Sequence, residues 1–289
     1  GSRPSPWSRS LVIMRLLRQR LKRHTALAFA GLVARQSCRS SSTDAASIAQ
    51  ALAAVRGRMD AARAERAASG AHSPDVRLVA VGKTKPLEDL IEAYAAGQRH
   101  FGENYVQEII GKVAEWDGMP NDIKWHFIGT LQSNKVNALA KGCPSLDCLE
   151  TLTSQKLARA VNRAWLEHNP GRKLRVMVQI NSSGEDSKGG LSSQESIDLC
   201  DFVHEQCEAL KLSGLMTIGA PDYSDCRTED FELLRSTRRE VAARLEVSPE
   251  DLELSMGMSN DFETAIVEGS TSVRVGSCIF GARTYPKKD

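Results

Sequence analysis

The chain has 289 residues, of which 41% are apolar and 26% are charged, so it can bury one large core or two small ones. Its formal net charge is only +2, and no stretch approaches the roughly 18 uninterrupted apolar residues that a membrane span needs. This is the composition of an ordinary globular protein, and we expect no transmembrane helix.

Residues 1–43 differ in kind from the rest, with nine Lys or Arg, many Ser and no acidic residue. Arginines alternate with Leu, Val and Ile between Leu11 and Leu21, a pattern typical of an organellar transit peptide. We therefore expect a mitochondrial location, with plastid and cytoplasm as alternatives. A disordered basic arm for nucleic acid is the rival interpretation, but such arms carry interleaved aromatic residues that are nearly absent here.

The rest of the chain has the opposite charge. Without residues 1–43, 29 basic residues stand against 36 acidic ones, and the formal charge falls from +2 to −7. A domain with this charge does not favour polyanions, so we expect no nucleic-acid partner.

From Asp44 onward the pattern alternates regularly. A long Ala-rich helix is expected over Ala45–Ala68. Strand-like runs follow at 76–82, 99–102, 124–128, 146–149, 174–180, 212–216, 252–255 and 272–275. Helix-period segments lie at 87–96, 106–116, 133–139, 154–168, 193–210, 228–245 and 261–268.

Strands that alternate with helices imply a parallel sheet, and eight such units predict a single closed (β/α)8 barrel of the TIM type. We expect this α/β barrel domain over residues 44–289, with an extra N-terminal helix. A doubly wound open sheet is the alternative, although no G-x-G-x-x-G follows the first strand.

Lys83 stands at the end of the first expected strand, where the chain turns through Thr84, Lys85 and Pro86. The C-terminal ends of the strands form the rim at which such barrels do chemistry, and a lysine there can form a Schiff base with an aldehyde. An isolated lysine in a loop is usually only solvated, so its interpretation depends on the other residues of the rim.

The last two strands supply those residues. The seventh expected strand leads into S-M-G-M-S-N-D-F from Ser255, and the eighth into R-V-G-S, which begins at Arg274. Small residues there let backbone N–H groups approach an anion, and the loops after strands seven and eight are the usual phosphate site of this barrel. Arg274 either donates to a ring nitrogen in the barrel mouth or forms a salt bridge on the outer surface.

Six ordered motifs together resemble the pyridoxal phosphate homeostasis proteins, also called YggS-like or proline synthase co-transcribed proteins. The motifs are V-G-K-T-K-P at 81–86, F-G-E-N-Y-V-Q-E at 101–108, W-H-F-I-G-T-L-Q-S-N-K at 125–135, G-L-M-T-I-G at 214–219, S-M-G-M-S at 255–259 and R-V-G-S at 274–277. The resemblance covers about Asp44 to Tyr285. It implies a fold-type III barrel, like the N-terminal domain of alanine racemase, that holds pyridoxal 5′-phosphate (PLP).

The resemblance also implies the roles of single residues. Lys83 would hold PLP as a covalent Schiff base, with Lys85 as a bystander. The other cofactor-binding residues would be Ser259, Gly276 and Ser277 at the phosphate, Arg274 at the pyridine nitrogen, and Asn104, His126 and Met216 along the pocket. Many relatives have Ser where this chain has Gly82, and Pro or His where it has Thr130. No residue is expected to be catalytic and, since no H-x-x-x-H pair occurs, no metal site is expected.

An amino-acid racemase needs two bases, and in alanine racemase the second is a tyrosine from a separate C-terminal domain. None of the tyrosines at 94, 105, 223 and 285 stands out as that base. We therefore expect a protein of intracellular PLP homeostasis and delivery that is not an enzyme, with apo PLP-dependent enzymes as recipients and a monomer or weak dimer as its state. A racemase-like enzyme is the alternative, and a sugar-phosphate barrel enzyme is a third. Lys188, after the fifth strand, is a candidate for handing over the aldehyde.

Overall fold

The computed structural model describes residues 46–182, 189–218 and 228–282. The chain divides into a unit of residues 1–45 and a unit of residues 46–289, and the fold below is that of the second unit. The transit-peptide-like segment and Lys188 lie outside the described residues.

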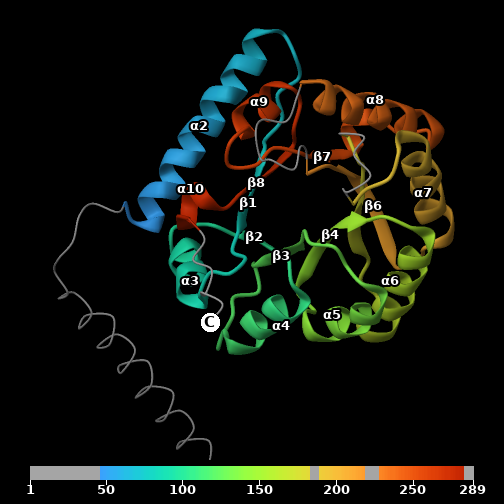
Figure 1. Ribbon diagram of the computed structural model, residues 1–289, viewed down its shortest axis with the longest axis horizontal. Helices are drawn as coiled ribbons and strands as arrows, with labels where there is room; N and C mark the ends of the chain where they lie inside the picture. The colour runs from blue at the N-terminus through green and yellow to red at the C-terminus, as the bar shows by residue number, and fades with distance from the viewer. Residues whose placement is uncertain (1–45, 183–188, 219–227, 283–289) are drawn as a thin grey trace, which may run out of the picture. The chain divides into compact units, whose positions relative to one another are not determined.

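Eight parallel strands form a closed barrel in which each strand pairs with the next and β8 returns to β1. The strands are β1 Arg77–Val81, β2 His100–Glu103, β3 Lys124–Phe127, β4 Leu146–Leu152, β5 Leu174–Gln179, β6 Leu210–Met216, β7 Glu253–Ser255 and β8 Ser272–Val275. Helices surround them in an outer ring (Figure 1). The expected (β/α)8 barrel is confirmed, and the open-sheet alternative is wrong.

The helices also follow the expected order. They are α2 Ile48–Ala68, α3 Leu87–Ala95, α4 Val106–Glu115, α5 Val136–Gly142, α6 Gln155–His168, α7 Ser193–Gln206, α8 Thr228–Arg244, α9 Phe262–Val267 and α10 Ser277–Phe280, with short 3-10 turns at Ser133–Lys135 and Pro249–Asp251. One expected helix was too long: α7 stops at Gln206 because Cys207 leaves the helical conformation and β6 begins three residues later. Among the described helices, none combines the length and the apolar character that crossing a bilayer requires.

Helix α2 covers the sector of the barrel after β8. The helix that follows β8, α10, has only four residues, so it cannot shield the β8–β1 edge alone. Helix α2 begins with a capping box at Ser47 and buries Leu52, Val55 and Met59. It runs beside α3, α9 and α10 (Figure 1).

The interior of the barrel is charged, unlike the branched apolar filling that is usual for this fold. At the N-terminal ends of the strands, Arg77 and Arg175 both pair with Glu253, and Arg175 also pairs with Asp147 at 2.8 Å. The main apolar core lies instead between the strands and the outer helices. Its largest fully buried side chains include Trp125, Trp165, Phe101, Phe127 and Phe231. Folding therefore rests on this outer layer, which leaves the barrel interior available for polar groups.

Candidate functional site

Lys83 follows β1 directly and stands at the C-terminal rim of the barrel. The N–H of Gly82 still donates to the carbonyl of Gly102 in β2 at 3.0 Å, and the N–H of Lys85 then folds back to the carbonyl of Gly82. Thr84, at φ 63°, turns the chain toward α3. The half-buried Lys83 is therefore presented at the rim by a fixed strand end and a tight turn.

Lys85 is engaged in a different place. Its Nζ donates to the carbonyl oxygens of Phe280 at 2.6 Å and Ala282 at 2.9 Å, beyond the eighth strand. These bonds tie the β1–α3 loop to the segment after β8, and the role of Lys85 as a bystander stays a prediction.

A buried carboxylate, Glu103 at the end of β2, lies next to this strand end. Its Oε1 accepts a hydrogen bond from Nζ of Lys112 at 2.7 Å, and Lys112 also donates to the carbonyl of Gly82 at 2.8 Å. Its Oε2 is buried and has no hydrogen-bond partner among the described residues. Burial raises the pKa of Glu103 to about 7, although the positive charges of Lys112 and Lys83 oppose this shift.

Glu103 and Leu90 leave little room for a side chain at position 82, directly before the lysine. A Cβ at position 82 would lie 2.9 Å from Oε1 of Glu103 and from Cδ1 of Leu90. Gly82 therefore lets the strand that ends at Lys83 pack against the carboxylate. Sequence reasoning missed Glu103, although a glutamate directly after the expected strand 99–102 was a usable signal.

The segments that follow β7 and β8 meet beside β1. The backbone N–H of Gly276 donates to Oγ of Ser259 at 3.2 Å, which joins the two expected phosphate-binding loops. A Cβ on Gly276 would lie 3.2 Å from the carbonyl oxygen of Val81, so this loop touches the strand that leads to Lys83. Ser277 follows as the first residue of α10. The structure thus brings the serine and glycine segments to the same part of the rim as the lysine.

Arg274 points into the barrel, where its side chain is buried. The residue is only 4% exposed, and its guanidinium donates to Oγ of Ser255 at 2.6 Å and to the carbonyl of Thr217 at 2.5 Å. The alternative of a salt bridge on the outer surface is wrong. Ser255 in β7 and Thr217 just after β6 therefore hold the cation at a fixed position near the barrel mouth.

A hydrogen-bonded chain of side chains continues from Arg274 through the barrel interior. Ser255 donates to Oε2 of Glu150 at 2.6 Å, Oε1 of Glu150 contacts Nδ1 of His126 at 2.6 Å, and Nε2 of His126 contacts Nδ1 of His100 at 2.9 Å. Burial opposes the ionisation of Glu150, but its bond to His126 and the charge of Arg274 outweigh it and lower the pKa to about 2. The chain therefore contains a buried carboxylate that offsets the buried arginine.

His126 is one of the residues of this hydrogen-bonded chain. It is fully buried within β3, and both ring nitrogens already have protein partners. Burial, with a smaller contribution from the neighbouring His126, lowers the pKa of His100 to about 3, so His100 is neutral. These contacts make His126 a link between β2, β3 and β4, and its expected place along the cofactor pocket stays a prediction.

The structure also brings together residues of metal-ligand type that the sequence spacing does not reveal. His126 lies with Cys148 and Glu150, and also with His100 and Asp147. In both groups the nitrogens of His126 are occupied by the hydrogen bonds of the chain described above.

Asn104 supplies a direct test of whether the rim fits a cofactor. It follows β2, and its Oδ1 is buried without a hydrogen-bond partner among the described residues. A buried amide oxygen of this kind needs a donor, and a bound polar group can provide one. Met216, the last residue of β6, is 1% exposed and packs with Cys148 and Met177. The rim residues therefore fit a polar, anionic cofactor that carries a reactive carbonyl.

Comparison with known proteins identifies the family. The profile "Alanine racemase, N-terminal domain" matches residues 58–284. The pyridoxal phosphate homeostasis proteins of Mus musculus and Homo sapiens are 51% and 50% identical to this chain over 216 residues, which make up 73% of this chain and 78% of each relative. The chain belongs to the pyridoxal phosphate homeostasis protein family.

Solved structures agree with this family. PipY of Synechococcus elongatus with PLP bound is 33% identical, superposes with a TM-score of 0.64, and is matched over its full length by 81% of this chain. Alanine racemase of Bacillus anthracis, at 16% identity and a TM-score of 0.51, shows only that the barrel is shared; the match covers 78% of this chain and 56% of the racemase. Pyridoxal phosphate homeostasis proteins and alanine racemases thus share one barrel.

Proposed function

We propose that this protein binds PLP through Lys83 as a covalent Schiff base and acts in intracellular PLP homeostasis. One observation carries the proposal. The loops after β7 and β8, joined by the hydrogen bond between Ser259 and Gly276, lie against the end of β1, which presents Lys83. Membership of the pyridoxal phosphate homeostasis protein family supports it, as does the PLP bound to PipY.

The chain's own residues divide the work of binding. Ser259, Gly276 and Ser277 hold the phosphate, and the orphaned Oδ1 of Asn104 accepts a hydrogen bond from the cofactor. Bound PLP supplies a reactive aldehyde and an electron-withdrawing ring. A guanidinium such as that of Arg274 donates only, so it keeps a pyridine nitrogen unprotonated and weakens the ring as an electron sink.

This arrangement favours holding the cofactor over chemistry on an amino acid. Racemisation needs a second base opposite Lys83. Tyr94 lies in α3, where its hydroxyl is bonded to Asp122 at 2.8 Å, and Tyr105 is 57% exposed at the rim. Tyr223 and Tyr285 lie outside the described residues. We propose that the protein lacks strong catalysis, with a racemase-like activity as the alternative that an assay over the common amino acids would detect.

The test of binding is the visible absorption spectrum of the purified protein after incubation with PLP. Lys83→Ala should abolish the absorbance band of the Schiff base, whereas Lys85→Ala should keep it because Lys85 is bonded to carbonyls beyond β8. Peptide mapping after borohydride reduction should find the label on Lys83. A band of equal strength in Lys83→Ala would refute the assignment.

We also propose import into mitochondria, which rests on the basic, Ser-rich composition of residues 1–43. A fluorescent protein fused behind residues 1–43 should enter mitochondria, and replacing the arginines of this segment with glutamine should prevent entry. Plastid or cytoplasmic fluorescence would support the alternatives.

We propose apo PLP-dependent enzymes as the recipients of the cofactor. Assays that follow the transfer of PLP from the loaded protein to such an apoenzyme would test this.

A further inference from the structure

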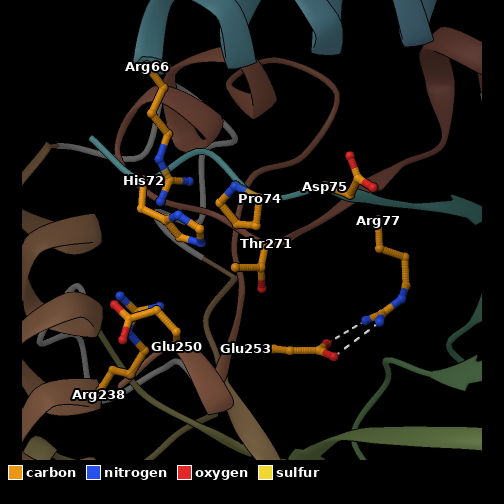
Figure 2. Close-up of a pocket in the computed structure, with 9 residues that line it drawn as sticks. All are labelled: Arg66, His72, Pro74, Asp75, Arg77, Arg238, Glu250, Glu253 and Thr271. Atoms are coloured by element: carbon orange, nitrogen blue, oxygen red, sulfur yellow. Dashed lines mark hydrogen bonds and ion pairs between the residues drawn. The ribbon is translucent and has the colours of Figure 1, made fainter. Parts of the chain in front are cut away.

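A second pocket lies at the end of the barrel opposite Lys83. It has a volume of about 370 Å³ and is lined by Arg66, His72, Pro74, Asp75, Arg77, Arg238, Glu250, Glu253 and Thr271. Arg77 and Glu253 are the first residues of β1 and β7, so the pocket is at the N-terminal ends of the strands. Figure 2 shows Arg66 reaching toward it from α2 and Arg238 from the opposite side.

The charged residues of this pocket fall into two groups. Arg77 is paired with Glu253, and Asp75 is paired with Arg63 at 2.6 Å. Arg66 and Arg238, by contrast, have no ion-pair partner in the part of the chain that the structure describes. Arg235, which lies on helix α8 together with Arg238, forms ion pairs with Glu232 and Glu268. The pocket therefore contains two cations without a direct ion pair among the described residues, although the carboxylate of Glu250 partly offsets the charge of Arg238.

The side chain of Arg66 is withdrawn from water, and that of Arg238 is half-buried. Arg66 is only 7% exposed, and its hydrogen bonds are two long ones, from one terminal nitrogen to the carbonyls of Ile266 at 3.4 Å and Ser270 at 3.3 Å. The Nε of Arg238 is buried without an acceptor among the described residues. Burial lowers the pKa of Arg66, and the charges of Arg238 and Arg235 lower it further. A buried cation without an ion-pair partner, such as Arg66, is costly, and an anion bound between Arg66 and Arg238 would reduce this cost.

We propose that this pocket is a second binding site, distinct from the Lys83 rim, for the phosphate group of a small molecule. Two guanidiniums that approach from α2 and α8 offer the planar forks that match phosphate oxygens. The volume of about 370 Å³ lies within the range of small-ligand sites and exceeds the need of a phosphate alone.

Glu250 provides a further test of the proposal, because it is a carboxylate of the pocket that forms no ion pair with an arginine among the described residues. Its Oε2 accepts a hydrogen bond from Ser248 at 2.6 Å, and its charge acts on Arg238. This carboxylate opposes an incoming phosphate. Replacing it with glutamine should therefore tighten binding, whereas a purely structural arginine cluster would show no such response.

The decisive experiment is calorimetric titration of the PLP-loaded protein with inorganic phosphate and with glycerol 3-phosphate, against sodium chloride at matched ionic strength. The cofactor fills the rim, and its absorbance confirms that it stays there. We expect saturable binding that Arg238→Gln weakens about tenfold or more. Arg239→Gln is the matched control, because Arg239 is the next residue of α8 but is exposed and paired with Glu232. Glu250→Gln should bind more tightly.

Tighter binding of glycerol 3-phosphate would assign the site to phosphate esters, and equal binding would assign it to free phosphate; both support a phosphate site. Absence of saturable binding beyond the chloride control would overturn the proposal, and so would equal binding by wild type and Arg238→Gln. If PLP does not load, the rim adds the same phosphate binding to every variant, and only the difference between wild type and Arg238→Gln reports on this pocket. Arg66→Gln is a second variant, and Arg238→Gln decides the question if that protein does not fold.

Discussion

Glu103 contributes to the site although it was not among the residues expected to bind the cofactor. Its carboxylate contacts Lys112, which in turn holds the carbonyl of Gly82 immediately before Lys83. One carboxylate oxygen stays without a partner among the described residues, so the ionised form is poorly stabilised. The protonation of Glu103 is therefore coupled both to stability and to the strand end that carries the lysine.

Glu103→Gln should reduce the pH dependence of stability. The folded protein raises the pKa of Glu103 from 4.5 to about 7, so this group contributes stability that is full below the unfolded value and is lost as pH rises through 7. The loss is on the order of 3 kcal/mol, and glutamine cannot show it. Urea unfolding of wild type and variant between about pH 5 and pH 8 measures it. The prediction would be contradicted if the free energy of unfolding changed equally with pH in both proteins.

Ser255→Ala should interrupt the buried chain of hydrogen bonds between Arg274 and Glu150. The hydroxyl accepts from Arg274 and donates to Glu150, so its removal leaves a buried donor and a buried acceptor unsatisfied. We expect a loss of about 1–3 kcal/mol in the free energy of unfolding. Ser236→Ala is the control, because that hydroxyl bonds only a carbonyl of its own helix. Similar small losses in the free energy of unfolding in both variants would show that the hydrogen bonds of Ser255 do not stabilise the fold.

At the scale of elements, the site depends on backbones that come unusually close. Gly276 touches the end of β1, and Gly129, after β3, lies against the backbone of Asn104. A Cβ on Gly129 would be 2.0 Å from the carbonyl oxygen of Asn104, a distance that no side chain adjustment can relieve. Neighbouring strand ends therefore set the position of Asn104 through main-chain packing.

Gly129→Ala should destabilise the protein and displace Asn104, so that both the unfolding midpoint and PLP affinity fall. Gly111→Ala in α4 is the matched control, since a Cβ there meets nothing within 4 Å. Replacing this helical glycine should stabilise the protein by about 0.5–1 kcal/mol. Thermal unfolding and absorbance titration measure both quantities. The packing argument fails if the two variants behave alike.

At the scale of the whole barrel unit, α2 completes the outer layer. Arg58 of α2 pairs with Glu263 of α9 at 2.5 Å and lies over the ring of Phe262. The apolar stripe of α2, including the fully buried Leu52, belongs to the main core. The fold therefore closes with a helix from the beginning of the barrel unit rather than with one that follows β8.

A chain that begins at Ser73, without α2, should lose cooperative unfolding and bind a dye for exposed apolar surface, because it uncovers the apolar faces of α9 and α10. The control is a chain that begins at Asp44 and keeps the capping box at Ser47. It should unfold cooperatively, as wild type does. Urea unfolding followed by circular dichroism distinguishes the two, and a cooperative transition without α2 would contradict this role.

The order and type of the elements could be read from the sequence, because short apolar runs and helix-period segments reflect local patterns of burial. The barrel, the strand end at Lys83 and the serine and glycine segments after β7 and β8 followed from these patterns and from the family motifs. Element ends were less certain, as α7 shows, because caps such as Cys207 depend on tertiary packing.

The sequence by itself determined that Lys83 and Gly276 leave strands at the same rim, since parallel strands share one C-terminal edge. Only the tertiary structure decided what surrounds them. His126, Glu150, Ser255 and Arg274 come from four strands, and their hydrogen bonds form only when the barrel closes. The ion pair of Arg77 and the lack of one for Arg66 among the described residues were likewise beyond the sequence, because long-range distance, not residue type, determines which buried charges are balanced.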